Sequence, residues 1–143
     1  MTYRHILLAA DLAPDTALVA ERAKALAGPQ TRITLVHVIE PLALAYGAEM
    51  PVDLGSLQEE ITRQAQQRLD LLGSQLGIAT ADRVLATGTI EREILRLAGE
   101  RQADLIVIGS HSRRGLAALL GSTANAVLHH ARCDVLAVRI ARD

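Results

Sequence analysis

The sequence predicts an α/β domain: an open, doubly wound, parallel five-stranded sheet with helices on both faces. Apolar runs that suit strands alternate with segments of helical periodicity along the whole chain. Several of these runs are continuously apolar, as expected of parallel strands that are covered on both sides. The chain has 143 residues, half of them hydrophobic, which fits a single domain over residues 1–143 with a sizeable core.

Two strands and a helix are predicted before residue 40. His5–Ala10 (HILLAA) is a continuous apolar strand that ends at Asp11. Pro14-Asp15 opens a helix, for which Gly28-Pro29 is the predicted stop. Arg32–Ile39 (RITLVHVI) is rich in β-branched residues and predicts the second strand. The stretch EPLALAYGAEMPVDLG, with two prolines and two glycines, predicts a long loop.

The second half repeats the alternation. Ser56 and Glu59 form the pattern S-x-x-E, which predicts a capping box at the start of a helix that runs to near Gly77. The remaining predicted elements are a short strand around Arg83–Ala86, a helix marked by Ile90, Ile94, Leu97 and Ala98, a strand over Asp104–Ile108, a helix over Leu116–Ala131 and a last strand over Val135–Ile140.

Composition argues against several kinds of partner. Fifteen Lys and Arg against sixteen Asp and Glu leave a net charge of −1, so no broad basic surface for nucleic acid or membrane is indicated. There is no Phe or Trp to stack the bases of a single strand. The single cysteine, Cys133, fits a reducing compartment, and the first apolar run meets Asp11 too early for a signal peptide or membrane span. We therefore expect a cytoplasmic protein without nucleic-acid binding or membrane insertion.

A phosphate-binding loop is suggested near the end of the chain. The stretch GSHSRRGLAALLGST follows an apolar run and contains two Gly-Ser pairs. Glycine permits close approach of a ligand, and a helix N-terminus offers free N–H groups to phosphate. A polyphosphate would lie across Ser110–Arg114 and Gly121–Thr123, where hydroxyls and two arginines supply donors. From the residues alone, the alternative that these pairs only turn the chain stays open, because neither G-x-x-x-x-G-K-[ST] nor a G-x-G-x-x-G after the first strand is present.

Four stretches in this order carry a resemblance to a known family: HILLAADL, LVHVIEP, ADLIVIGSHS and GSTANAVLHHARCDVLAVR. Together they make nearly the whole chain resemble the universal stress proteins, a family of small doubly wound α/β domains that form dimers. One branch of the family holds ATP with the pattern G-x2-G-x8–9-G-[ST], whereas many A-type members lack the pattern and do not retain ATP. The first half of this chain is similar to the A-type branch, and its last third is similar to the nucleotide-binding branch.

The resemblance implies a site for an adenine nucleotide, either AMP or ATP with or without Mg²⁺. Asp11 would contact the adenosine part and Val38 would line the adenine site. Gly109 would open the phosphate loop, on which Gly121-Ser122-Thr123 would close. The candidate cofactor-binding residues are Ala9, Ala10, Asp11, Val38, Ile108, Gly109, Ser110, Ser112, Arg113, Arg114, Gly121, Ser122 and Thr123. No catalytic or metal-binding residue is assigned, and for Asp11 a helix-entry cap is the equal alternative.

Ser112 departs from the family pattern, because it stands where the second glycine is expected and gives G-x2-S-x8-G-S. A serine forced to positive φ would cost on the order of 1 kcal/mol. ATP would then be held weakly or not at all, and Ser112→Gly is expected to tighten its binding.

Two functions of different classes follow. The first is a dimeric stress regulator that binds an adenine nucleotide and acts on a regulatory protein partner not identifiable from sequence; the second is a dimeric interaction protein with a vestigial site. No Asp or Glu lies between Gly109 and Ala131, so a fast ATPase is not expected and only slow hydrolysis stays open. The last strand, Val135–Ile140, is apolar apart from Arg139, and we expect it to pair with a second copy as a homodimer.

Overall fold

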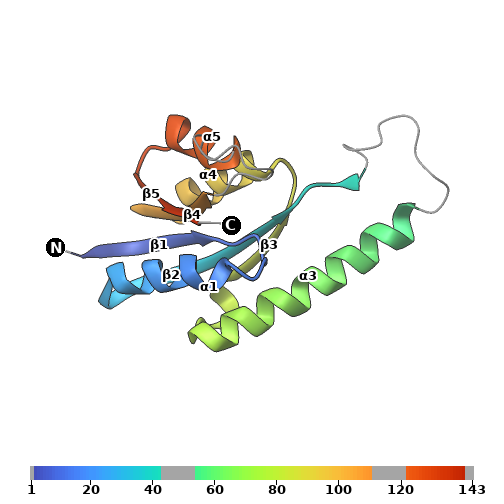
Figure 1. Cartoon of the computed structure of the whole chain (residues 1–143), viewed down its shortest axis with the longest axis horizontal. Helices are drawn as coiled ribbons and strands as arrows, with labels where there is room; N and C mark the ends of the chain where they lie inside the picture. Colours follow the sequence, from blue (N-terminus) through green and yellow to red (C-terminus); the bar gives the residue numbers. More distant parts are fainter. Residues whose placement is uncertain (1, 43–53, 111–121, 141–143) are drawn as a thin grey trace.

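The computed structural model describes residues 2–42, 54–110 and 122–140. Five strands form one sheet in the order β3-β2-β1-β4-β5, and every neighbouring pair is parallel (Figure 1). The strands are β1 (Tyr3–Ala9), β2 (Ala27–Ile39), β3 (Arg83–Thr87), β4 (Leu105–Ser110) and β5 (Asp134–Arg139). The chain winds outward in both directions from β1, which lies between β2 and β4. The predicted doubly wound α/β fold is therefore confirmed.

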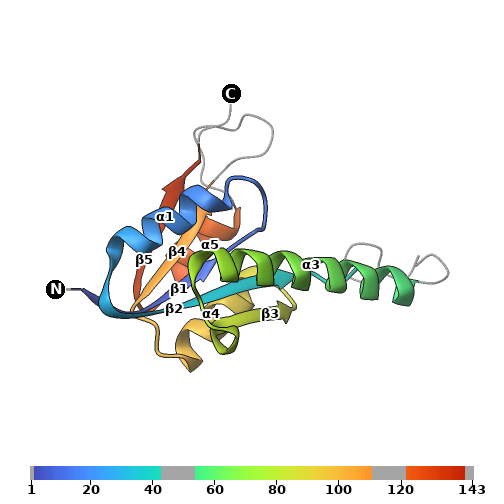
Figure 2. The ribbon, with the colours of Figure 1, turned by 90° about the horizontal axis from the view of Figure 1, so that it is seen from below.

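Helices cover both faces of this sheet. They are α1 (Thr16–Leu26), α3 (Leu54–Leu76), α4 (Ile90–Glu100) and α5 (Ser122–His130), with a short 3-10 turn at Thr80–Asp82. Figures 1 and 2 show α1 and α3 on one face and α4 and α5 on the other, with one end of α3 reaching well past the sheet. No helix in the described ranges combines the length and the apolar character needed to cross a membrane.

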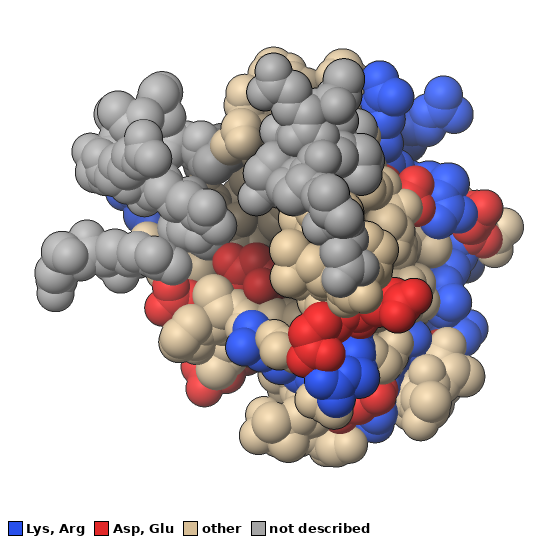
Figure 3. Space-filling view, turned by 90° about the vertical axis from the view of Figure 1, so that its right-hand side faces the viewer, with Lys and Arg blue, Asp and Glu red and all other residues tan. Residues whose placement is uncertain are grey.

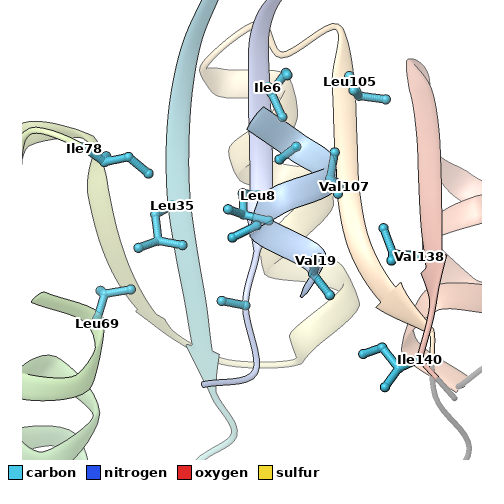
Figure 4. Packing of buried hydrophobic residues seen from close by; sticks show 13 residues of the cluster. Ile6, Leu8, Val19, Leu35, Leu69, Ile78, Leu105, Val107, Val138 and Ile140 are labelled. Carbon is cyan, nitrogen blue, oxygen red and sulfur yellow. The ribbon is translucent and has the colours of Figure 1, made fainter. Parts of the chain in front are cut away.

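The central strand β1 divides the core between the two faces. Ile6 and Leu8 pack with the α1 and α3 side, as Figure 4 shows, whereas Leu7 and Ala9 pack with the α4 and α5 side. Ile6, Leu7 and Leu8 are completely buried, and each large aliphatic side chain removed from water contributes about 1.5–3 kcal/mol. Burial on both faces explains why this segment of the sequence is continuously apolar.

Helix α1 ends just before Gly28-Pro29, as predicted, but β2 begins at Ala27 and not at Arg32 as predicted. The last residue of the helix is Leu26, and the Gly-Pro pair lies inside β2, where the register with β1 shifts between Tyr3 and His5. Thr31 satisfies this irregular stretch: its hydroxyl accepts a hydrogen bond from the Gly28 N–H at 2.8 Å and donates one to the Tyr3 carbonyl at 2.6 Å. Proline is tolerated in a strand where the hydrogen-bond ladder is interrupted in this way.

Two other predicted boundaries differ. Helix α3 already includes Leu54, so Ser56 lies inside the helix and the capping-box prediction is wrong. Strand β4 continues to Ser110, so Gly109 and Ser110 belong to the end of a strand and not to the loop after it. Helix α5 agrees with the second part of the helix predicted over Leu116–Ala131, and residues 116–121 lie outside the described residues.

Candidate functional site

The carboxyl ends of three strands meet at one edge of the sheet. Ala9, at the end of β1, pairs with Val36 of β2 on one side and with Ile108 of β4 on the other. The Ala10 N–H then donates to the Val36 carbonyl at 2.8 Å, which holds the chain between its neighbours for one residue more. Figure 3 looks onto this end of the molecule and shows acidic side chains near its centre. Ligands of open α/β sheets bind at such a switch point.

A cavity of about 310 Å³ opens beside this edge, on the face of the sheet that carries α3. Its walls are the loop after β1, the end of β2 and one side of α3. The lining residues are Asp11, Leu12, His37, Val38, Ile39, Glu40, Ile61, Gln64, Ala65 and Arg68. Two of the candidate residues from the sequence, Asp11 and Val38, are among them.

Asp11 braces the chain between β1 and α1. Its Oδ1 atom accepts hydrogen bonds from the Ala13 N–H and from the Thr16 hydroxyl, both at 3.0 Å. Asp15 is the N-cap residue of α1, although its side chain makes no capping hydrogen bond to the helix. Asp11 holds the loop before α1 and the hydroxyl of the first helical residue, so it is not the helix-entry cap that the sequence left as an equal alternative, and its carboxylate also lines the cavity.

Leu12, the next residue, has a left-handed backbone with φ of 62°. An L-residue with a side chain pays roughly 1–2 kcal/mol for this conformation. Leu12 lines the cavity and also packs against the core on the α1 and α3 side. Backbone strain of this kind concentrates at binding sites, where the surrounding packing enforces it.

The ring of His37 ties β2 to β1 at the same place. Its Nδ1 atom lies 2.7 Å from the Ala10 carbonyl oxygen. Because a carbonyl can only accept, Nδ1 carries the proton and donates. In the neutral ring, Nε2 is then a hydrogen-bond acceptor.

The cavity is acidic on the side of the sheet and basic on the side of the helix. The exposed carboxylates of Asp11 and Glu40 lie at the ends of β1 and β2, and the exposed guanidinium of Arg68 belongs to α3. Within the described part of the chain, Arg68 forms no ion pair with either carboxylate. The cavity thus presents both acceptors and a strong donor to a ligand.

A sequence model of the universal stress protein family matches residues 2–139 of the chain. The protein belongs to the universal stress protein family. It is 40% identical over 141 residues to universal stress protein A homolog 2 of Coxiella burnetii, and the alignment covers 96% of each chain. The predicted family is thereby confirmed, and with it the assignment as a stress-response protein.

Solved structures of universal stress proteins share the fold. UspA from Lactobacillus plantarum superimposes with a TM-score of 0.78 at 20% identity, covering 97% of this chain and 99% of that one. A universal stress protein crystallised in complex with cAMP gives a TM-score of 0.60 at 21% identity, covering 96% of this chain and 98% of that one. At these identities the likeness establishes the fold alone.

The other candidate residues of this universal stress protein fall into two groups. Ala9, Ala10, Ile108, Gly109 and Ser110 lie at the ends of β1 and β4 on the same edge, and Ser122 and Thr123 are the first described residues of α5. Among the described residues, none of these seven lines the cavity. Ser112, Arg113, Arg114 and Gly121 lie outside the described residues.

Most residues of the cavity wall were not among the candidates predicted from the sequence. His37 is the polar residue in the otherwise apolar run LVHVI near the end of a predicted strand, so a signal was present, although strand alternation places its side chain on the opposite face from that of Val38. The α3 residues Gln64 and Arg68 carried no local signal, because their part in the site depends on how α3 packs along the sheet.

Within the described ranges, no three His, Cys, Asp or Glu side chains cluster as a metal site requires.

Proposed function

We propose that this universal stress protein binds an adenine nucleotide at the carboxyl edge of its sheet and acts as a dimeric regulator in the stress response. One observation carries the proposal. Asp11 and Val38, which the family resemblance assigns to the adenosine part of the ligand, come from the loop after β1 and from β2, and they line one cavity.

The cavity suits a nucleoside. Its volume of about 310 Å³ lies at the lower end of the range for small-ligand pockets, which favours one nucleoside over a dinucleotide. Leu12 and Ile61 offer apolar surface to a flat base, and an arginine such as Arg68 can stack on one. The carboxylates of Asp11 and Glu40 can accept hydrogen bonds from sugar hydroxyls.

The phosphates would extend toward β4 and α5. Ser110 ends β4 on the same edge, and α5 runs back from this edge because it leads to the amino end of the parallel strand β5. Its first described residues, Ser122 and Thr123, therefore lie on the phosphate side, where hydroxyls and backbone N–H groups can hold an anion. The relative crystallised with cAMP supports an adenine nucleotide as the ligand class.

Dimerisation is proposed through β5. In the described sheet this strand pairs only with β4, which leaves its other edge without a strand partner. An antiparallel pair of β5 strands around a two-fold axis would cover both edges at once. A regulatory protein partner and a cytoplasmic location remain part of the same proposal.

The nucleotide is tested first. Purified protein is denatured, and the supernatant is analysed by absorbance and mass spectrometry for adenine nucleotide. The protein, freed of any bound nucleotide, is then titrated with ATP, with and without Mg²⁺, by calorimetry. We expect binding; no heat and no thermal shift at millimolar ATP would instead support the dimeric interaction protein with a vestigial site.

A pair of variants on one helix tests the location. Gln64 lines the cavity, whereas Gln67, exposed on the same helix, does not. Gln64→Trp should fill the cavity and weaken ATP binding at least tenfold, whereas Gln67→Trp should bind ATP like the parent. Equal affinities in both variants would place the nucleotide elsewhere.

A further inference from the structure

The side chain of His37 points toward helix α3. Leu35, two residues earlier in β2, packs with the α1 and α3 side of the sheet, whereas Val36 and Val38 pack with the α4 and α5 side. Alternation along the strand puts His37 on the face of Leu35. This is the face on which the cavity opens, and His37 lines it.

The hydrogen bond to Ala10 leaves one ring nitrogen available. Nδ1 donates to the Ala10 carbonyl, and in the described parts of the chain this is the single hydrogen bond of the ring. Nε2 therefore has no partner among the described residues, although the side chain is half-buried. A partly desolvated acceptor with a fixed orientation is suited to a donor brought by a ligand.

The surrounding charges select the kind of donor. On the sheet side, His37 stands with the carboxylates of Asp11 and Glu40, all of them acceptors, whereas Arg68 supplies donors from α3. Phosphate oxygens, which are acceptors, would meet repulsion at the sheet wall. The hydroxyls of a sugar and the amino group of a base are donors that this wall can accept.

We propose that His37 is a specificity-determining residue of the nucleotide site, whose Nε2 accepts a hydrogen bond from an O–H or N–H group of the bound nucleoside. The inference rests on the proposed nucleotide binding. It adds a residue, a tautomer and a direction of hydrogen bonding to that proposal. The donor is a ribose hydroxyl or the exocyclic amino group of adenine, and the two sources are separated by ligand analogues.

Two substitutions test the roles of the two ring nitrogens of His37 separately. His37→Asn places an amide N–H near the position of Nδ1, so the bond to the Ala10 carbonyl is kept while the Nε2 acceptor is removed. His37→Gln reaches as far as Nε2 and can present its carbonyl oxygen there as an acceptor. Circular dichroism and thermal unfolding confirm that each variant is folded before it is titrated.

The experiment measures dissociation constants by calorimetry for the parent and both variants. The ligands are ATP, its 2′-deoxy and 3′-deoxy analogues, and purine riboside triphosphate, which lacks the amino group. The parent should bind one analogue about fivefold more weakly than ATP, as the loss of one hydrogen bond predicts. His37→Asn should bind ATP about fivefold more weakly but that analogue no more weakly than the parent does, and His37→Gln should stay within twofold of the parent for ATP.

The outcomes distinguish the two proposals. If the parent binds ATP and no analogue is discriminated, or if His37→Asn weakens ATP and all analogues equally, the role of His37 is overturned and nucleotide binding stands. If the parent binds no adenine nucleotide at all, both proposals fail together. Should both variants fail to fold, the parent alone can still overturn the role of His37, by binding ATP and all the analogues with equal affinity.

Discussion

The backbone of Gly109 lies against the side chains of Ile140 and Val19. A Cβ atom built on Gly109 would stand 3.0 Å from Cδ1 of Ile140 and 3.2 Å from Cγ2 of Val19, closer than ordinary van der Waals contact. Both neighbours are buried, and Val19 belongs to α1. The family resemblance assigns Gly109 to the opening of a phosphate loop, but in the structure the missing side chain also lets α1 and the residue that follows β5 pack onto β4.

Gly109→Ala should therefore destabilise the protein. The added methyl forces Ile140 and Val19 outward by a few tenths of an ångström, and overpacking of this kind costs about 1 kcal/mol or more. Gly99→Ala is the matched control, because no atom lies within 4 Å of a Cβ at Gly99 and alanine favours the helix by about 0.5–1 kcal/mol. Urea unfolding should place the two midpoints on opposite sides of the parent; equal midpoints would contradict the packing role.

A buried hydrogen bond between His5 and Thr34 is the next target. His5 Nδ1 donates to the Arg101 carbonyl at 2.8 Å, so Nε2 accepts from the Thr34 hydroxyl at 2.6 Å, and both side chains are buried. Thr34→Val keeps the shape but leaves Nε2 without a donor, which costs about 1–3 kcal/mol. In a double-mutant cycle with His5→Phe, we expect a coupling of at least about 1 kcal/mol from denaturant unfolding; additive effects would show that the bond contributes nothing net.

The order and type of the elements follow from local patterns of the sequence. HILLAA and DLIVI are continuously apolar because both faces of β1 and β4 are covered, and that property is visible in any short window. The exact ends of helices and strands, by contrast, depend on contacts with residues that are far away in the sequence. The Gly28-Pro29 pair lies in β2 because Thr31 satisfies the backbone there, and no local pattern indicates the bond from Thr31 to Tyr3.

The residues of the candidate site also divide into those that the sequence indicated and those that it did not. Asp11 and Val38 were assigned to the site by the family resemblance, and both stand at or just after the ends of converging strands, where ligands of open α/β sheets bind. Arg68 and Gln64 reach the cavity only because α3 packs along the end of β2, and the sequence of an amphipathic helix does not state which strand end it will meet. Leu12 has positive φ although it is not glycine, so no rule for turn residues could have indicated the strain there.

Asp104 should give the protein part of its resistance to acid. Desolvation raises the pKa of its carboxyl group. Hydrogen bonds from the backbone N–H groups of Arg4 and His5, at 3.0 Å and 2.9 Å, lower the pKa by more than desolvation raises it, so the pKa of Asp104 lies below its usual value. The folded state therefore favours the carboxylate. Its contribution is fully present above the unfolded pKa of about 4 and is lost as the pH falls through the lower folded pKa.

Asp104→Asn should accordingly be less stable than the parent by about 1 kcal/mol at pH 7, since hydrogen bonds to a charged acceptor become bonds to a neutral one. The difference should shrink as the pH is lowered toward 3 and below. Urea unfolding at a series of pH values measures both chains in parallel. A difference that stayed constant over this range would mean that the charge of Asp104 does not act as described.

The free edge of β5 can be altered without touching the sheet. The Ile140 N–H donates to the Ser110 carbonyl of β4 at 3.1 Å. Backbone groups alternate sides along a strand, so Val138 and Leu136 also turn toward β4, and Ala137 turns its N–H to the outer edge. Val138 is buried in the core, so a charge placed there would unfold the domain before it reported on association.

Ala137→Pro is the sharper test of the proposed dimer. Proline removes the outward N–H and is tolerated on an edge strand, so the domain should stay folded while antiparallel pairing of two β5 strands loses a hydrogen bond near its centre and meets the ring. Ala137→Ser keeps the N–H and is the matched control. In sedimentation at tens of micromolar, the parent and Ala137→Ser should be dimers, and Ala137→Pro should dissociate at least tenfold more readily. A monomeric parent, or a folded proline variant that dimerises as tightly as the parent, would place any association on another surface.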